Sequence, residues 1–262
     1  MKRLLASILS ALVALAALAA PTKAEDLAEI IARGEIVVGV DMTTPPWGYL
    51  NDKQQPDGYG VALGQVLADS LGVKLRIEQV TGPTRIPTLL AGRADTIIST
   101  LSITAQRATQ VWFTNPYSAN ALVLIAPQAA AFSSYADLGQ GVRIAVPRGS
   151  PQDQIVTANA PNATIMRFDD DAGPLQALVT GQADLLGAGI LVPPVLNEMA
   201  PGKNFEVKIT LSSPYMAMAV RPGNINLLQF LNTFIFLQKQ SGKLDELSRQ
   251  FLGIPSGNLP SF

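Results

Sequence analysis

Residues 89–95 of the chain read Leu-Leu-Ala-Gly-Arg-Ala-Asp, and residues 178–184 read Leu-Val-Thr-Gly-Gln-Ala-Asp. Both copies have the features of a helix end that runs into a buried strand, with Gly92 or Gly181 as the left-handed cap. The pattern is too short to prove a duplication. It nevertheless supports two lobes of similar architecture.

Around each copy, apolar strand patterns alternate with helical patterns. Residues 35–41 (EIVVGVD) predict a buried strand, and residues 60–71 have the spacing of a helix that stops at Gly72. The same alternation predicts further strands at 73–80, 95–99, 121–126, 142–146, 164–168, 184–186 and 215–220, and a long helix at 225–240. It favours an α/β fold in which each lobe is a mostly parallel sheet flanked by helices. Since no long Gly/Ser or Pro linker separates the lobes, we expect strands to join them.

The N-terminus has the three-part layout of a secretory signal peptide. A short basic start precedes an apolar run over 4–20, and small residues follow. Cleavage could follow Ala19 or Ala24. An uncleaved anchor helix is disfavoured, because the run is slightly shorter than the ~20 residues of a membrane span and no stop-transfer flank follows. We therefore expect a periplasmic protein with a signal peptide at 1–24, one lobe from 25–118 plus 216–262, and the other from 119–215.

The composition excludes several kinds of chemistry. The chain has 262 residues, of which 48% are hydrophobic and 15% charged, and it contains neither cysteine nor histidine. Disulfides, thiol nucleophiles, imidazole metal ligands and Ser-His-Asp triads are therefore excluded. The formal net charge of −1 argues against a nucleic-acid partner. Without soft ligands or a carboxylate cluster, we expect no metal and no cofactor.

Four stretches resemble the periplasmic solute-binding proteins that serve ABC importers of polar amino acids. They are residues 38–47, 57–72, 84–99 and 100–117. The last is the most specific, because it matches Ser/Thr-x-x-x-Thr-x-x-Arg followed by Asn-Pro-Tyr. The resemblance implies a two-lobed periplasmic binding protein fold, two crossover strands between the lobes, a ligand in the cleft, and hinge closure on binding.

Arg107 is the main candidate for binding a carboxylate. It follows a strand that ends near Ser99, and ligands of open α/β sheets bind outside the carboxyl ends of strands. A guanidinium there suits a carboxylate, although an Arg that caps a helix or pairs with an acid is the alternative. Ser99, Thr100 and Ser102 could be turn or cap residues before the next helix. The resemblance implies that Thr100 and Ser102 contact the ligand and that Ser99 is more often positional.

Four further residues are candidates through the resemblance. Arg85, in Thr-Arg-Ile-Pro, matches the arginine that reaches the second carboxylate of an acidic amino acid, so two cleft arginines would predict a doubly anionic ligand. Asp41 would take a distal cation, or pair with Arg85, or stabilise the turn after it. Trp47 would form an apolar wall or belong to the core. Ser150 matches a helix start that holds the ligand carboxylate.

Two positions depart from the family pattern. Thr44 stands where relatives place an aromatic that stacks on the ligand, and Gly189 stands where they place the aspartate that binds the ammonium group. A buried ammonium without a carboxylate partner is costly. Either Asp41, Asp170 or Asp171 takes that role, or the ligand lacks an α-ammonium.

The resemblance implies the extracytoplasmic substrate-binding component of an ABC transport system for polar amino acids, which include acidic ones. We expect a monomer without enzymatic activity that passes a small carboxylate ligand to an inner-membrane permease. A dehydratase of the cyclohexadienyl or arogenate type on the same scaffold is one alternative, with Asp41, Asp170, Asp171 and Tyr49 as its candidate acids and bases. A stand-alone receptor that feeds a sensor is another.

Overall fold

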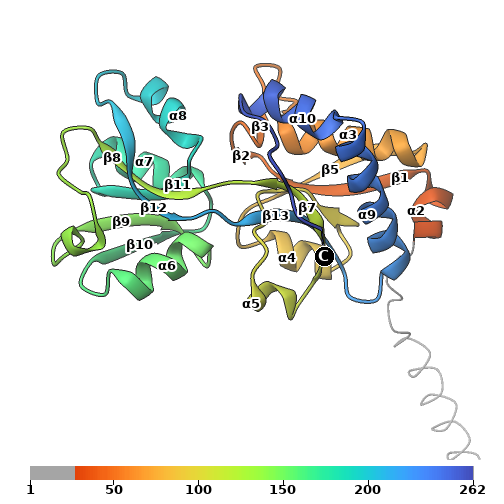
Figure 1. The fold of residues 1–262 in the computed structure, drawn as a ribbon, viewed down its shortest axis with the longest axis horizontal. Helices are drawn as coiled ribbons and strands as arrows, with labels where there is room; N and C mark the ends of the chain where they lie inside the picture. The colour runs from red at the N-terminus through yellow and green to blue at the C-terminus, as the bar shows by residue number, and fades with distance from the viewer. Residues whose placement is uncertain (1–26, 262) are drawn as a thin grey trace, which may run out of the picture.

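The computed structural model describes residues 27–261, so the predicted signal peptide lies outside the described residues. Two five-stranded sheets, each flanked by helices, stand side by side and are connected by extended chain (Figure 1). We call the sheet of β1 with its helices the first lobe and the sheet of β9 with its helices the second lobe. The predicted two-lobed α/β fold is confirmed. Within residues 27–261, no helix combines the length and apolarity needed to cross a membrane.

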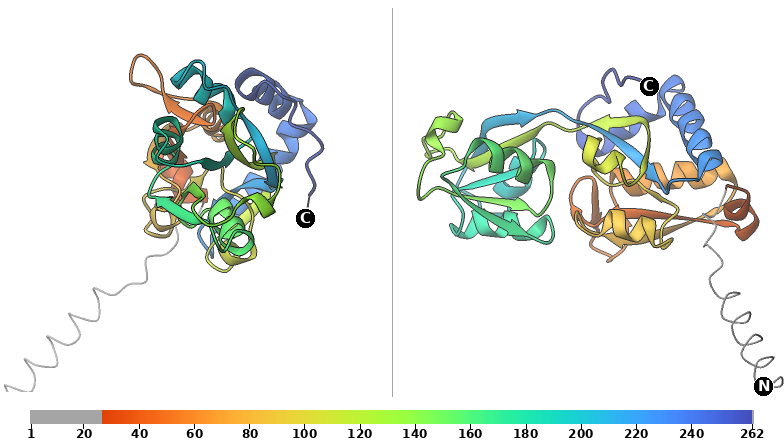
Figure 2. Two further views of the ribbon diagram at one scale, coloured as in Figure 1. Left: turned by 90° about the vertical axis from the view of Figure 1, so that its left-hand side faces the viewer. Right: turned by 90° about the horizontal axis from the view of Figure 1, so that it is seen from below.

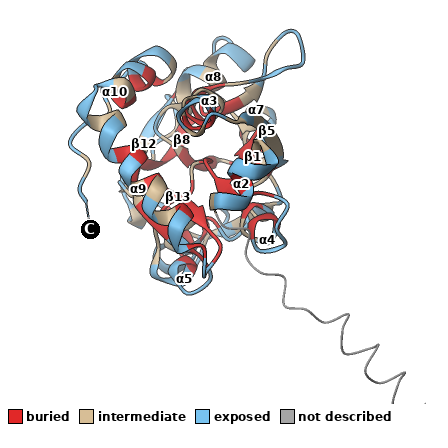
Figure 3. Ribbon diagram, turned by 90° about the vertical axis from the view of Figure 1, so that its right-hand side faces the viewer, coloured by how far each residue is buried: buried red, intermediate tan, exposed pale blue. Residues whose placement is uncertain are grey.

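The first sheet has the strand order β5-β1-β6-β13-β7. Its strands are β1 (Glu35–Asp41), β5 (Lys74–Val80), β6 (Thr96–Ile97), β7 (Trp112–Ala119) and β13 (Tyr215–Val220). The helices of this lobe are α2 (Leu27–Arg33), α3 (Tyr59–Leu71), α4 (Arg85–Leu90), α5 (Ala105–Ala108), α9 (Ile225–Gln240) and α10 (Lys243–Leu247), followed by a π-helical turn η2 (Ser248–Leu252). A small sheet of β2 (Thr43–Thr44), β3 (Gly48–Leu50) and β4 (Pro56–Asp57) lies beyond the end of β1. Buried residues concentrate where the helices face the sheet (Figure 3).

The second sheet has the order β10-β9-β11-β8-β12. Its strands are β8 (Leu122–Pro127), β9 (Arg143–Pro147), β10 (Thr164–Phe168), β11 (Leu185–Gly189) and β12 (Phe205–Ser212). Its helices are α6 (Pro151–Asn159), α7 (Ala172–Thr180) and α8 (Val192–Met199), with a 3-10 turn η1 (Tyr135–Asp137). Apolar side chains cover both faces of the central strands.

Two strand pairs connect the lobes. β7 continues into β8 through residues 120–121, and β12 returns into β13 through residues 213–214, so the chain crosses twice (Figures 1 and 2). The crossing strands pair antiparallel, whereas β1 and β9 pair parallel with both of their neighbours. Each sheet therefore has four strands that run in one direction and one that runs against them, as expected for the mostly parallel sheets predicted from the sequence. The strand that runs in the opposite direction is β13 in the first sheet and β8 in the second, whereas β7 and β12, which the sequence pattern did not predict, run with the parallel strands.

The repeated sequence pattern adopts the same local structure in both lobes. Gly92 and Gly181 have φ values of 74° and 78°, which are in the left-handed region predicted for them. The closing aspartate of each copy accepts a hydrogen bond from the backbone N–H of the neighbouring strand, from Val37 to Asp95 at 2.7 Å and from Arg143 to Asp184 at 2.8 Å. Each copy thus fixes one strand beside the next.

Candidate functional site

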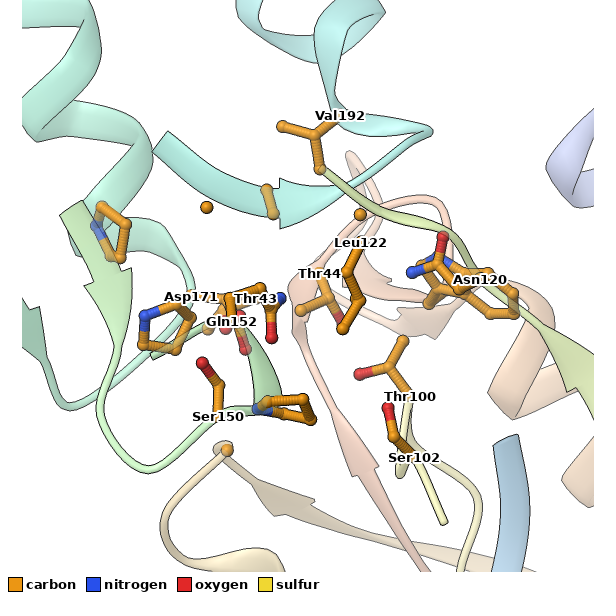
Figure 4. A pocket seen from close by; sticks show the side chains of 18 of the residues that line it. Thr43, Thr44, Thr100, Ser102, Asn120, Leu122, Ser150, Gln152, Asp171 and Val192 are labelled. Atoms are coloured by element: carbon orange, nitrogen blue, oxygen red, sulfur yellow. The ribbon is translucent and has the colours of Figure 1, made fainter. Parts of the chain in front are cut away.

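A cavity of about 900 Å³, including the part open to solvent, lies between the lobes. It is lined by the turns that follow strands of both sheets and by the first crossover (Figure 4). Of the predicted site residues, six line it: Trp47, Arg85, Thr100, Ser102, Arg107 and Ser150. Asp41 and Ser99 do not line the cavity, although both are buried directly behind its wall.

Arg107 provides a positive charge without a counter-ion. Thr104 caps the short helix α5 by accepting a hydrogen bond from the Arg107 backbone N–H, and the Arg107 guanidinium donates to the Ser102 carbonyl at 3.1 Å. No acidic side chain within residues 27–261 pairs with it, although it is only 8% exposed. Burial, and then the charge of Arg85, lower the pKa of Arg107 to about 9, so it remains cationic at neutral pH. Such a cation favours an anionic ligand.

Hydroxyl and amide groups line both sides of the cavity. Figure 4 places Ser150, Gln152 and Asp171 of the second lobe on one side and Thr100 and Ser102 of the first lobe on the other. Ser150 caps α6 by accepting a hydrogen bond from the backbone N–H of Asp153 at 3.1 Å. The free N–H groups at such a helix start favour a negative charge.

Arg85, at the start of α4, is the second buried guanidinium. Its Nη1 donates weakly to the Ser99 carbonyl and to the Thr100 hydroxyl, each at 3.4 Å, and its Nε is buried without a hydrogen-bond partner. Burial lowers the pKa of Arg85, while the charges of Asp171 and Asp41 act in the opposite direction. Arg85 therefore has acidic neighbours, which Arg107 lacks.

Two carboxyl groups, one from each lobe, meet beside Arg85. One oxygen of Asp41 accepts hydrogen bonds from the Thr43 backbone N–H at 2.9 Å and the Thr43 hydroxyl at 2.7 Å. The other oxygen is buried, and the Asp171 carboxyl lies within hydrogen-bonding reach of the Asp41 side chain. Burial, and then the charge of Asp41, raise the pKa of Asp171 to about 7. Two close carboxylates cannot both ionise freely, so the pair tends to hold a proton.

Ser99 and Trp47 have supporting positions. The Ser99 hydroxyl accepts a hydrogen bond from the Asp41 backbone N–H at 3.2 Å, which holds the end of β1. Trp47 packs edge-to-face on Tyr59 with ring centroids 5.5 Å apart, and it also reaches the cavity wall. Trp47 therefore combines its two predicted roles, as core residue and as pocket wall.

Several residues that line the cavity were not singled out from the sequence, among them the polar residues Arg148, Gln152 and Asn120. Asn120 lies on the first crossover beside Gly189, and a Cβ atom at position 189 would collide with its amide nitrogen. These residues come together only in the folded protein, so no sequence pattern predicted that they line the cavity. Among residues 27–261, no group of three or more His, Cys, Asp or Glu side chains is placed to hold a metal ion.

The two lobes also touch each other directly. The Gln154 amide of α6 donates to the Gln106 side-chain oxygen of α5 at 3.0 Å. The Asp171 carboxyl approaches Gly82 of the first lobe as well as Asp41. These contacts describe a closed arrangement of the two lobes.

Two mixed α/β lobes, two crossovers and a polar cavity between them define a two-lobed solute-binding protein. The family model of the bacterial extracellular solute-binding proteins, family 3, matches residues 36–254, and the chain belongs to this family.

Individual relatives extend the comparison. The ABC transporter glutamine-binding protein GlnH of Bacillus subtilis is 29% identical over 88% of this chain and 86% of its own. The cyclohexadienyl dehydratase of Pseudomonas aeruginosa is 27% identical over 70% of each chain. A crystal structure of a mutant of ArgBP from T. maritima superposes with a TM-score of 0.79 at 29% identity, covering 87% of this chain and 99% of the other.

Proposed function

We propose that this chain is the extracytoplasmic amino-acid-binding component of an ABC importer, and that its cavity binds the carboxylate of a polar amino acid. The observation that carries the proposal is the Arg107 guanidinium, which is 8% exposed and has no acidic partner within residues 27–261. A carboxylate would supply the missing charge, with Thr100, Ser102 and Ser150 as hydrogen-bonding neighbours.

The charges of the cavity favour a ligand with one carboxylate over a doubly anionic one. Arg85 shares its surroundings with Asp41 and Asp171, whose charges offset its own. Arg107 is left as the cation that a ligand must neutralise. An acidic amino acid would bring a second carboxylate, for which the described residues provide no second uncompensated cation in the cavity. Glutamine, which the B. subtilis relative is named for, carries only one carboxylate.

The transport context supports the same proposal. The family to which the chain belongs is described as extracellular. We therefore propose residues 1–24 as a cleaved signal peptide, the periplasm as the compartment and an inner-membrane permease as the partner of a monomer. Residues 25–118 plus 216–262 and residues 119–215 would be the two moving lobes, with hinges at the crossovers.

The first experiment is a thermal-shift screen with L-glutamine, L-arginine and L-glutamate, followed by calorimetry on the best probe. A ligand at ~100 times its Kd adds about 2.7 kcal/mol to the free energy of unfolding, which such a screen detects. Arg107→Ala is expected to weaken binding by roughly ten- to hundredfold or more, because it removes a buried charge-assisted hydrogen bond. Arg249→Ala, which removes an exposed arginine paired with Asp245, is the matched control. Unchanged affinity in Arg107→Ala would refute the carboxylate site.

A dehydratase is the second candidate function, and one observation favours it. Asp171 lines the cavity beside Arg85, and its pKa is raised to about 7, so part of the population could donate a proton to a leaving hydroxyl group. A dehydratase also occurs among the relatives. Incubation with prephenate or arogenate, followed by product detection, distinguishes turnover from simple binding, and Asp171→Asn should abolish any turnover.

A further inference from the structure

Asn120 has a buried polar side chain that forms no hydrogen bond with the residues the structure describes. It stands on the first crossover, between β7 and β8, and is 8% exposed. Its side-chain oxygen is enclosed without a hydrogen-bond partner, and within residues 27–261 no group bonds to its amide nitrogen either. Only the backbone of Asn120 is engaged, where its N–H donates to the Pro214 carbonyl of the second crossover at 3.3 Å.

An amide in this state normally costs stability. Burial of an unpaired polar group is unfavourable, so buried amides in folded proteins usually have partners. An apolar residue at position 120 would avoid that cost. A ligand in the cavity would supply the missing hydrogen-bond partner and offset this cost, because Asn120 is part of the cavity wall (Figure 4).

The neighbouring backbone is shaped to leave room for this amide. Gly189, at the end of β11, has no side chain, and a Cβ atom there would collide with the Asn120 nitrogen. Position 189 can therefore carry no carboxylate or other side chain while Asn120 holds its position. The amide nitrogen is the end of the Asn120 side chain that is not enclosed, so it is available as a hydrogen-bond donor.

We propose that Asn120 is a ligand-binding residue on the hinge, whose amide nitrogen donates a hydrogen bond to a ligand oxygen. The ligand class is an amino acid whose carboxylate or side-chain carbonyl oxygen reaches the first crossover. Because the Asn120 backbone also contacts the second crossover, this bond connects ligand capture to the segment that bends when the lobes close. The inference rests on the proposed function and adds a binding group to the same cavity.

The test compares Asn120→Ala, Asn120→Asp and the exposed control Asn162→Ala by calorimetry, with whichever of L-glutamine, L-arginine and L-glutamate binds the wild-type protein. Asn120→Ala should lower the affinity by about tenfold. It should leave the Tm of the ligand-free protein unchanged or higher, since it removes an unpaired buried polar group. Asn120→Asp should bind more weakly still, because a carboxylate would repel the ligand oxygen. Asn162→Ala should bind like the wild type.

Several outcomes would overturn the proposal. Unchanged affinity in Asn120→Ala, or a lower Tm without weaker binding, assigns Asn120 a purely structural role. Tighter binding in Asn120→Asp than in Asn120→Ala would place a ligand cation here and refute the donor role. Failure of the proposed function is distinguishable, because the wild-type protein would then bind none of the three amino acids.

Discussion

At the scale of single residues, the two buried arginines of the cavity have different electrostatic surroundings. Within residues 27–261, Arg107 has no acid beside it, whereas Arg85 shares its surroundings with two acids that come from different lobes. Asp41 ends β1 in the first lobe and Asp171 precedes α7 in the second, so a rotation that opens the lobes would separate the two carboxyl groups. Closure and protonation of this pair are therefore linked.

This linkage predicts proton uptake on ligand binding at pH 7. In an open protein, Asp171 would have a pKa near the ordinary value of about 3.9, and closure raises it to about 7. The closed form then binds more protons than the open form between about pH 4 and pH 7, so binding strengthens as the pH falls through this window. We expect about half a proton taken up per ligand, measured by calorimetry in two buffers with different ionisation heats.

The controls isolate the group responsible. Asp171→Asn should lose this uptake, whereas Asp69→Asn, at an exposed position of α3, should keep it. If wild-type protein and Asp171→Asn take up equal numbers of protons, the two carboxyl groups are not coupled through closure.

The residues of the cavity were predictable to different degrees. Arg107, Thr100 and Ser102 follow one strand in a recognisable order, so the chain itself carries their pattern. Asn120 becomes a cavity residue only because β8 and β11 pair side by side, which brings Gly189 next to it. From the sequence, Asp171 was considered as a substitute partner for the ammonium group and as a candidate acid or base of a dehydratase. Its contact with Asp41 depends on how the lobes close, which residue order does not encode.

At the scale of elements, the repeated pattern makes the same bond in two different environments. Asp95 is 2% exposed, and besides the Val37 N–H it accepts from the Arg33 guanidinium at 2.6 Å. The Asp184 side chain is 34% exposed, and its charged partner is Arg143 at 2.7 Å. If a buried acceptor is removed, its donor has neither a protein group nor a water molecule to bond to. If an exposed acceptor is removed, water can take its place.

We therefore predict that Asp95→Ala destabilises the protein more than Asp184→Ala does. Asp95→Ala should lower the free energy of unfolding by about 2–3 kcal/mol, because the Val37 N–H would remain buried without a partner. Asp184→Ala should cost clearly less. Urea unfolding followed by far-UV circular dichroism measures both variants, and equal losses would show that burial does not set the difference.

The elements were predictable from the sequence where one hydrophobic pattern coincides with one whole strand or helix. β1, β10, β13 and α9 have the bounds that the sequence patterns predict. β7 and β12 were not predicted, and both carry register shifts in their ladders. β12 also exposes several residues, so its period-two pattern is weak. Its strand structure depends on the partner strand β8, which is far away in the sequence.

At the scale of the whole molecule, the contact between Gln106 and Gln154 provides a reporter of closure. Their side chains meet at 3.0 Å across the lobes, outside the cavity lining. The chain contains no cysteine, so Gln106→Cys/Gln154→Cys introduces the only two thiols of the protein. A rotation about the two crossovers would separate these positions, because each belongs to a different lobe.

We predict that the amino acid which binds in the calorimetric screen increases cross-linking of this double variant by a short bismaleimide. The ligand stabilises the closed form by its differential affinity, and closure brings the two thiols within reach of one reagent. Adding Arg107→Ala to the double variant should abolish the increase while leaving the yield without ligand unchanged, which separates ligand-driven closure from an effect of the reagent. Equally high yields with and without ligand in the original double variant would mean that the lobes are already closed when empty. Arg107 would then have to bind its carboxylate in a preformed cavity, without hinge closure.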